Sequence, residues 1–586
     1  MLSTFIKILN YLHPRRKIQF IGLGILILIS SLSEIISIGA IVPFLGVVTN
    51  PQSAIEYFNK FSFVPNLFQR LTPNDLVLFF TIAFGAAALI SGVIRLVLLY
   101  ATIRLSNSTG AELSVDLYKK TLYQPYKVHI SRNTSEIISG ITQKVASASG
   151  VLISLVTVAS SFFIFISIIV SLVYIDPVLT IMSGIVFSGF YLVIAKVTKS
   201  KVSINGQIIA KEQTGIVRSL QEGLGGIRDI ILDNSHELYC HIYRTSLFRL
   251  TKSNSENTFL NQSPRFALEA IGLVLISFLA YWATLENGSL QSAIPALGAL
   301  GMGAQRLLPL LQQWYGNWSN YVSLKPALSE VFLLLDQKIP EEYESTIPVE
   351  PLKFEKEIKI LGLSFSYPGT SKKVLDSIDL SIPVGSRIGI IGETGSGKST
   401  LMDLLMGLVE PTSGKILIDH NELNSNNYLR WRKTIAHVPQ AIFLADTTIA
   451  ENIAFGESLE KINFPQLEKA IEVSQLTNFI KSLPEGINTS VGERGVRLSG
   501  GQRQRIGIAR AIYKNAKVIF FDEATSALDG DTEQSVMDSI EDIDFGLTMI
   551  YVTHRLSTIR RCNEIIELKK GLISRRGTYE GLFSKE

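Results

Sequence analysis

Cysteine is scarce in this chain, and neither sign of charge is in large excess. With only 2 cysteines in 586 residues, the chain lacks the disulfide framework that holds small secreted domains together. The net charge is only +4, which gives no reason to expect a nucleic-acid partner. No short apolar run followed by a small-residue cleavage site stands near the start, so we expect no cleavable signal peptide. No Cys/His peptidase segment precedes the first long apolar run, which disfavours a peptide exporter with its own protease.

Long apolar runs, in contrast, are abundant before about residue 315. Hydrophobic residues make up 47% of the chain and the mean hydropathy is +0.28. A stretch of roughly 20 apolar residues is enough to cross a bilayer as a helix. We therefore expect six spans, near residues 18–48, 75–104, 151–174, 178–195, 266–285 and 292–314. Residues 51–74 fit either a short amphipathic helix on the outer surface or an ordinary loop.

The distribution of lysine and arginine predicts how these spans are oriented. Basic residues crowd the N-terminus and the two long polar segments that follow the second and fourth spans, whereas the two short turns near 176 and 287 carry none. The positive-inside rule then places both termini and both long segments in the cytoplasm. Leu2, Phe5, Leu9 and Leu12 recur at helical spacing before Arg15, which predicts an amphipathic helix on the inner membrane surface.

The pattern changes after a linker rich in Glu and Pro. We assign residues 1–335 to a helical transmembrane domain with cytoplasmic extensions, residues 336–351 to the linker, and residues 352–586 to a soluble α/β domain.

One motif organises the α/β domain. The apolar run Arg387 to Ile391 predicts a strand and Thr400 to Leu408 predicts a helix, and a glycine-rich turn joins them. Strand, G-x-x-x-x-G-K-[ST] turn and helix together form a phosphate-binding P-loop, in which backbone N–H groups point at negative charge. We expect the nucleotide to contact Gly392, Glu393, Thr394, Gly395, Ser396, Gly397, Lys398, Ser399 and Thr400.

Two further elements complete a nucleotide site. Val518 to Glu523 is an apolar strand that ends in two carboxylates: Asp522 is placed to hold Mg²⁺, and Glu523 to polarise the water that attacks the γ-phosphate. A second group of backbone N–H donors is expected before a helix that starts near Arg503. A domain is expected to have two phosphate-binding groups if each ATP is bound between two copies of the domain. The second group comprises Ser499, Gly500, Gly501 and Gln502.

With these motifs in place, the domain resembles an ATP-binding cassette (ABC) domain. The resemblance implies that Tyr367 stacks on adenine, that Gln440 senses Mg²⁺ and contacts the membrane domain, and that His554 supports the γ-phosphate. Mg²⁺ would be held by Ser399, Gln440 and Asp522. Six spans followed by one cassette resemble an ABC exporter half-transporter of the type IV fold. That layout implies a homodimer with coupling helices near 123–126 and 225–234.

Charged residues inside the expected spans are the sequence evidence on the chemical class of the substrate. Such residues cost about 2.5–3.5 kcal/mol each on insertion and are functional candidates by default. Arg95, Arg265 and Arg306 could bind phosphate oxygens, which would suit an anionic lipid substrate. Alternatively, Arg265 could pair with Glu269 one helical turn away, and Arg95 with Glu34.

Short motifs in the membrane domain favour one substrate class. Ser31 to Glu34 with Val42-Pro-Phe44, Pro264-Arg265, and Arg306-Leu307 with Pro309 resemble PglK-type flippases of polyisoprenyl-pyrophosphate oligosaccharides. The resemblance implies an ATP-driven flippase of an anionic lipid-linked saccharide in a bacterial inner membrane. The alternatives are a multidrug or lipid A-type exporter and, from another class, a nucleotide-gated channel or regulator.

Overall fold

Two units make up the structure, a computed structural model. It describes residues 1–40, 44, 47–48, 73–175, 177–287, 290–340, 343, 350–367, 369–370, 372–523, 529–541, 546–553 and 555–583. The membrane unit comprises Met1–Gln124 and Arg132–Lys338, and the cassette unit comprises Pro125–Ser131 and Ile339–Glu586. The short segment Pro125–Ser131 therefore belongs to the cassette unit although it lies in the N-terminal half of the sequence. The domain boundaries at 336–351 stay a prediction, because half of that range lies outside the described residues.

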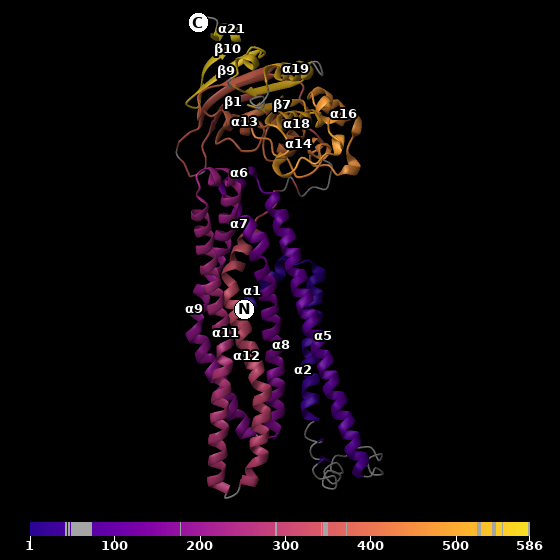
Figure 1. Cartoon of the computed structure of the whole chain (residues 1–586), viewed down its shortest axis with the longest axis vertical. Coiled ribbons are helices and arrows are strands. Elements are labelled where there is room, and N and C mark those ends of the chain that lie inside the picture. Colours follow the sequence, from indigo (N-terminus) through magenta and orange to yellow (C-terminus); the bar gives the residue numbers. More distant parts are fainter. Residues whose placement is uncertain are drawn as a thin grey trace. The chain divides into compact units, whose positions relative to one another are not determined.

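Long helices build the membrane unit, and several run side by side (Figure 1). Four of them have 46 to 52 residues, more than twice the length that a bilayer requires. Each therefore continues beyond a membrane span without a break. The helices are α1 (Leu2–Tyr11), α2 (Pro14–Gly39), α5 (Pro73–Leu122), α7 (Thr134–Ser139), the π-helix η2 (Gly140–Lys144), α8 (Ala146–Ile175), α9 (Pro177–Gly225), α10 (Ile227–Leu232), α11 (His236–Asn287) and α12 (Leu290–Leu335).

Three stretches of the described helices are long and apolar enough to cross a membrane: Pro14–Ser37, Asn74–Leu122 and Thr134–Val170. The other three expected spans fall within α9, α11 and α12, so the total of six stays a prediction. Residues 49–72, which include most of the expected outer helix, lie outside the described residues.

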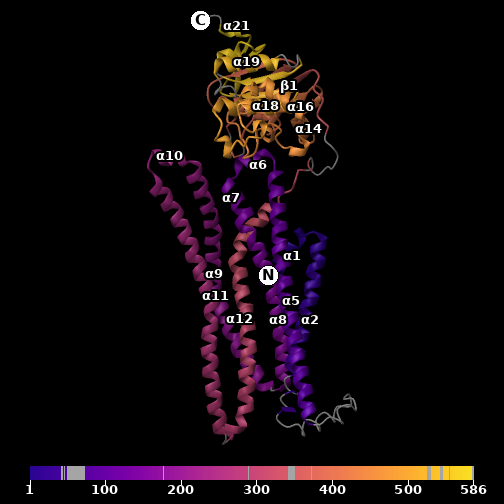
Figure 2. The same ribbon diagram turned by 45° about the vertical axis from the view of Figure 1, so that its right-hand side comes forward.

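Packing in the membrane unit depends on small residues as well as on apolar ones. A Cβ added at Gly206 of α9 would lie 2.3 Å from the carbonyl oxygen of Ser323 on α12, so glycine permits close approach of the two backbones. Of the four apolar residues expected on one face of the N-terminal helix, Leu12 just after α1 is buried, Phe5 and Leu9 are half-buried, and Leu2 is 72% exposed. Side chains such as Leu96 and Val93 on α5 are more than half exposed, which suits a lipid-facing surface. Figure 2 shows α9 and α11 side by side, with α10 at the turn that joins them.

Two sheets form the framework of the cassette unit. One has the strand order β2-β1-β4-β5 and is antiparallel; the other has the order β10-β9-β3-β8-β7-β6 and is parallel except for β10. The strands are β1 (Glu357–Phe365), β2 (Leu375–Pro383), β3 (Arg387–Ile391), β4 (Ser413–Ile418), β5 (Asn421–Glu422), β6 (Ile435–Val438), β7 (Val518–Asp522), β8 (Thr548–Val552), β9 (Glu564–Lys569) and β10 (Leu572–Gly577).

Helices surround these sheets, and the parallel arrangement positions the site. The carboxyl ends of β3 and β7 lie at the same edge of the sheet, separated only by β8, and that edge is where α/β folds bind ligands. The helices are α6 (Tyr126–Ser131), α13 (Lys398–Leu405), α14 (Tyr428–Thr434), α15 (Ile449–Ile453), η4 (Leu459–Lys461), α16 (Phe464–Val473), α17 (Thr477–Lys481), η5 (Gly486–Asn488), η6 (Glu493–Gly495), α18 (Gly500–Tyr513), α19 (Gly530–Glu541), α20 (Leu556–Ile559) and α21 (Tyr579–Phe583).

Candidate nucleotide site and membrane charges

The P-loop joins β3 to α13, and glycine is required at its two ends. Gly392 and Gly397 have φ angles of +145° and +106°. A Cβ at Gly392 would lie 2.2 Å from the carbonyl oxygen of Leu568, and one at Gly397 would lie 2.7 Å from Leu375 Cδ2. Any side chain at either position would therefore strain the backbone and clash with a neighbouring strand. The predicted strand coincides with β3, whereas the helix starts two residues earlier than predicted, at Lys398.

Polar groups within this loop fit a phosphate-bearing ligand. Lys398 is 8% exposed, and its Nζ donates to the carbonyl oxygens of Gly392 at 2.7 Å and Glu393 at 3.0 Å. The hydroxyl of Ser396 is buried and has no hydrogen-bond partner within the described residues. A buried polar group normally has a partner, so this hydroxyl and the ammonium are suited to phosphate oxygens. Tyr367, the predicted adenine partner, places its hydroxyl 3.3 Å from Thr400 Oγ1.

The two carboxylates reach the same edge of the sheet as the P-loop. Asp522 ends β7, and burial raises its pKa; neighbouring Glu523 raises it further, whereas Lys398 lowers it. Glu523 follows with a φ of +46°, and its backbone N–H donates to the carbonyl oxygen of Val552 at 2.8 Å. The amide of Gln440 donates to Glu523 Oε2 at 2.7 Å. Residues that are 83 positions apart in the sequence thus meet beside the P-loop.

The helix α18 begins at Gly500, three residues earlier than the start near Arg503 that the sequence predicts. Ser499 is its N-cap: the hydroxyl accepts from Gln502 N, and the Gln502 side chain accepts from Ser499 N. This reciprocal capping box fixes the first turn at the glycine pair, which the sequence pattern alone leaves open. The backbone N–H groups of the first turn therefore start where a second phosphate binder is expected.

Two predicted elements cannot be placed. His554, which the resemblance places at the γ-phosphate, and residues 524–528 after Glu523 lie outside the described residues. In the described part of the chain, no group of three or more His, Cys, Asp and Glu side chains is arranged to hold a metal. Ser399, Gln440 and Asp522 could therefore hold Mg²⁺ only together with nucleotide phosphates and water.

Comparisons with known proteins agree with this geometry. Models of the ABC transporter transmembrane region and of the ABC transporter domain match residues 20–293 and 375–526, respectively. The ATP-dependent lipid A-core flippase of Pseudomonas fluorescens (strain Pf0-1) is 30% identical over 81% of this chain and 78% of its own length. The chain belongs to the ABC transporters, and it is an exporter. Its ABC domain implies ATP binding, and it couples ATP hydrolysis to transport across a membrane that it spans several times.

Two further relatives extend over most of the exporter. The ATP-dependent lipid A-core flippase of Cupriavidus pinatubonensis (strain JMP 134 / LMG 1197) is 28% identical over 85% of this chain and 84% of its own. The structure of a bacterial Atm1-family ABC exporter with ATP bound superposes with a TM-score of 0.78 at 20% identity, and the match covers 97% of this chain and 96% of that one. At this identity the structural likeness establishes the fold.

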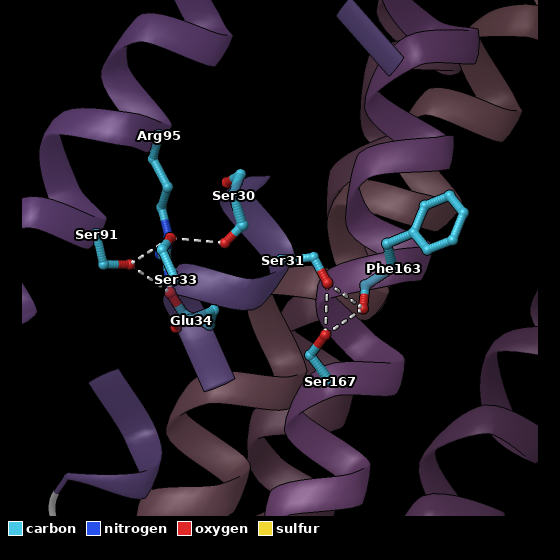
Figure 3. Close-up of polar contacts among 8 residues, drawn as sticks. All are labelled: Ser30, Ser31, Ser33, Glu34, Ser91, Arg95, Phe163 and Ser167. Atoms are coloured by element: carbon cyan, nitrogen blue, oxygen red, sulfur yellow. Dashed lines mark hydrogen bonds and ion pairs between the residues drawn. The ribbon is translucent and has the colours of Figure 1, made fainter. Parts of the chain in front are cut away.

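In the membrane unit, the exporter pairs two of the three predicted substrate arginines with carboxylates. Arg95 of α5 forms an ion pair with Glu34 of α2, and the Glu34 side chain is 1% exposed (Figure 3). Arg265 Nε donates to Glu269 Oε1 at 2.7 Å, one turn along α11. The internal pairing that the spacing allowed is thus present at both positions, and the side chain of Arg306 lies outside the described residues.

The surroundings of Glu34 contain two residues, Ser91 and Ser167, that the sequence analysis did not single out. Ser91 Oγ donates to Glu34 Oε2 at 3.1 Å, and the hydroxyls of Ser31 and Ser167 are 2.6 Å apart between α2 and α8 (Figure 3). Serine is a small side chain common at helix interfaces in membranes, so a run such as Ser-Ser-Leu-Ser-Glu inside an apolar span is the signal that could have indicated them.

Asp403 is a second residue that motif reasoning missed. It lies on α13, five positions after the P-loop lysine, and burial raises the pKa of its carboxyl to about 6, with a smaller contribution from Asp522. Tyr126 of α6 also has a raised pKa, mainly because of burial, with Asp403 and Tyr367 as further causes. Tyr126, at the end of the predicted coupling segment, therefore lies within electrostatic range of Asp403 inside the cassette unit.

Proposed function

We propose that the exporter flips an anionic, phosphate-bearing saccharide lipid from the inner to the outer leaflet of a bacterial inner membrane. The observation that carries this proposal is the similarity, over most of both lengths, to relatives named lipid A-core flippases. Both a polyisoprenyl-pyrophosphate oligosaccharide and a lipid A-type glycolipid belong to this class. The relatives favour the second, and the short motifs around Arg265 and Arg306 favour the first.

The physical need for a protein path follows from the phosphate group. An isolated charge in hydrocarbon costs tens of kcal/mol on an idealised Born estimate, so the headgroup needs a polar route. Arg265 and Glu269 are 57% and 47% exposed, so a phosphate could replace the carboxylate as the partner of this guanidinium. Arg95 pairs with the buried carboxylate of Glu34. If Arg95 bound a substrate phosphate, Glu34 would need another partner for its buried charge.

Reconstituted proteoliposomes test the substrate class. Wild-type protein should move a fluorescent polyprenyl-pyrophosphate saccharide, a fluorescent lipid A-type glycolipid or both, in an ATP-dependent manner, and Arg265→Ala should slow this movement. Lys252→Ala, on an exposed part of the same helix, is the matched control. If neither lipid moves while hydrophobic drugs stimulate ATP hydrolysis, the multidrug alternative is correct. ATP binding with ion conductance and no transport would support a channel.

For the ATPase cycle we propose these roles. Lys398 and the backbone N–H groups of the P-loop bind the β- and γ-phosphates, and Ser399, Gln440 and Asp522 hold Mg²⁺ directly or through water. Glu523 polarises the attacking water, and its hydrogen bond to Gln440 connects this carboxylate to the metal-sensing loop. Closure of two cassettes around ATP, followed by hydrolysis, then drives the transport cycle.

The assembly that we propose is a homodimer in which ATP lies between the P-loop of one chain and Ser499 of the other. Exposed apolar side chains support a second chain: on α10, Ile231 and Leu232 are 58% and 72% exposed, and on the cassette Phe443, three positions after Gln440, is 61% exposed. Cysteines at Ser396 and Ser499 should crosslink between chains, as should a pair at Leu232 and Phe443. Crosslinking within single chains alone would contradict this assembly.

The topology with both termini in the cytoplasm also remains a proposal. A cysteine at Asn287, the last residue of α11, should react with an impermeant label from outside the cell, whereas one at Asn234, after α10, should react only after permeabilisation. The reverse pattern would invert the orientation derived from the basic residues.

A further inference from the structure

The cytoplasmic extension of the membrane unit contains a cavity that the transport cycle described above does not use. It has a volume of about 690 Å³, within the range of small-molecule sites, and lies among α7, η2, α9, α11 and α12. All of its lining residues belong to the membrane unit. Five of its side chains are cationic and three are carboxylates. The cations are Arg132, Lys144, Lys211, Arg218 and Arg249.

Ion pairs within the cavity account for only part of this charge. Lys144 pairs with Glu330, and Arg249 Nη1 lies 3.7 Å from Glu212 Oε1. Across the described residues, Lys211, Arg218 and Arg132 have no carboxylate within ion-pair distance. The third carboxylate, Glu136, is also outside any ion pair in this part of the chain, so the cavity has a net excess of two positive charges. Like charges held together without counter-charges repel one another, so an anion that enters the cavity would be bound favourably.

The wall of the cavity contains a buried lysine and a π-helical turn. Lys144 is 2% exposed although lysine is rarely buried, and its Nζ donates to Thr214 Oγ1 at 2.8 Å. The π-helical turn η2 ends at this lysine, and such turns are rare and often occur at functional sites. Gly215 allows close packing in the wall, because a Cβ there would lie 3.2 Å from Ser246 Oγ and 3.4 Å from Glu212 Oε2.

The distance from the membrane selects the source of the anion. Lys211 is 34 residues after the first residue of α9, or about 50 Å along the helix axis at 1.5 Å per residue. A bilayer is about 40–45 Å thick including its headgroups, and its hydrocarbon core is about 30 Å thick. If α9 enters at the outer surface, as the proposed topology requires, the cavity lies beyond the headgroups of the inner leaflet. A phosphate that is tethered to a lipid in the membrane therefore does not reach it.

We propose that this cavity is a cytosolic binding site for a small, soluble anion that carries phosphate groups. Arg218 and Lys211 bind the phosphate oxygens, and Lys144 supplies a fixed positive charge in the wall. Since α9, α11 and α12 all line the cavity, the bound anion connects three helices of the membrane unit and stabilises one arrangement of them. The site is separate from the ATP site and from the arginines of the expected spans.

Binding of inorganic pyrophosphate to the full-length protein tests the proposal. Lys398→Ala serves as the background, because it weakens phosphate binding at the P-loop. Calorimetry should show one pyrophosphate site per chain that weakens as salt increases. Adding Arg218→Gln should weaken binding tenfold or more, since a charge-assisted hydrogen bond to phosphate is lost. Arg244→Gln, on an exposed position of α11 outside the cavity, is the matched control and should bind as the background does.

A second variant separates the charge from the cavity. Gly215→Leu places a bulky side chain at the cavity wall without changing charge and should also abolish binding, while gel filtration confirms that the protein remains intact. Geranylgeranyl pyrophosphate in lipid nanodiscs distinguishes the source: binding of this probe alone, without binding of inorganic pyrophosphate, would overturn the soluble-anion proposal. Equal pyrophosphate affinity in the background, Arg218→Gln and Gly215→Leu proteins would overturn the site itself. Neither result would affect the proposed lipid transport, which the flipping assay measures independently.

Discussion

Replacing Asp403 by asparagine should stabilise the cassette at neutral pH. The carboxyl is half-buried on α13, and burial, with a smaller contribution from Asp522, raises its pKa from an ordinary 3.8 to about 6. The folded state therefore binds this proton more tightly than the unfolded state does. Stability that is fully present below pH 4 is lost as the pH rises through about 6, and above pH 7 the full cost of the ionised, buried carboxyl remains.

The size of the effect follows from the pKa difference. A shift of about 2 units corresponds to roughly 3 kcal/mol. Because the carboxyl is only partly shielded from water, screening reduces this to about 1 kcal/mol. For a domain of this size, that stabilisation raises the midpoint of thermal unfolding by about 2–4 °C. Asp403→Asn should thus give this increase at pH 7.5 and almost none at pH 4.

Thermal unfolding of the full-length protein without nucleotide, followed by tryptophan fluorescence, measures this difference. Trp431 is fully buried in the cassette unit, and its indole N–H donates to the carbonyl oxygen of Leu405 at 2.7 Å, so it reports directly on α13. Glu468→Gln, at an exposed carboxylate on α16, is the control and should leave the midpoint unchanged at both pH values. An Asp403→Asn protein that is less stable than wild type at pH 7.5 would refute the reasoning, because the carboxylate would then be a net stabilising group.

Other predictions follow from single contacts. Glu523→Gln should abolish steady-state ATP hydrolysis and preserve ATP binding, whereas Lys398→Ala should weaken both; a Glu523→Gln protein with wild-type turnover would contradict the assigned role. Trp431→Ala should cost about 3–5 kcal/mol through the cavity that it leaves, and unfolding should shift to lower denaturant concentration. Arg95→Gln should destabilise the membrane unit by about 3 kcal/mol because Glu34 stays buried without its guanidinium, and the double variant with Glu34→Gln should restore folding yield. If the double variant folds no better than Arg95→Gln, the two residues do not act as a pair.

The nucleotide site could be predicted largely from the sequence. A P-loop is a contiguous segment, and its function depends on local backbone geometry that Gly392 and Gly397 determine by themselves. The apolar run that ends in Asp522 is also a local signal. A buried strand is expected to end where a charged carboxylate reaches solvent, so the sequence predicts where β7 ends. The pairing of Gln440 with Glu523 could be expected only from the family resemblance, since no local pattern connects residues so far apart.

Residue spacing along a helix could predict one of the two ion pairs in the membrane unit, but not the other. Arg265 and Glu269 are four residues apart, so helical geometry brings them together whatever the surrounding fold, and the sequence offered that pair as an alternative. Glu34 and Arg95 belong to different helices, and only the packing of α2 against α5 brings them into contact. The sequence could show that both were ionisable groups inside apolar spans, but it could not show that they meet.

By itself, the sequence determined the local features of this protein: which segments are apolar enough to span a membrane, which turn has the geometry of a P-loop, and which strand ends in two carboxylates. Tertiary structure alone decided which distant groups share one environment. Asp403 has a raised pKa because the fold buries its carboxyl and brings Asp522 near it, and Lys144 of η2 lines one cavity with Lys211 and Arg218 of α9 because the fold brings these two helices together. The physical reason is that burial and electrostatic interactions depend on distances in space, which hydrophobic periodicity and motif spacing do not encode between segments far apart in the chain.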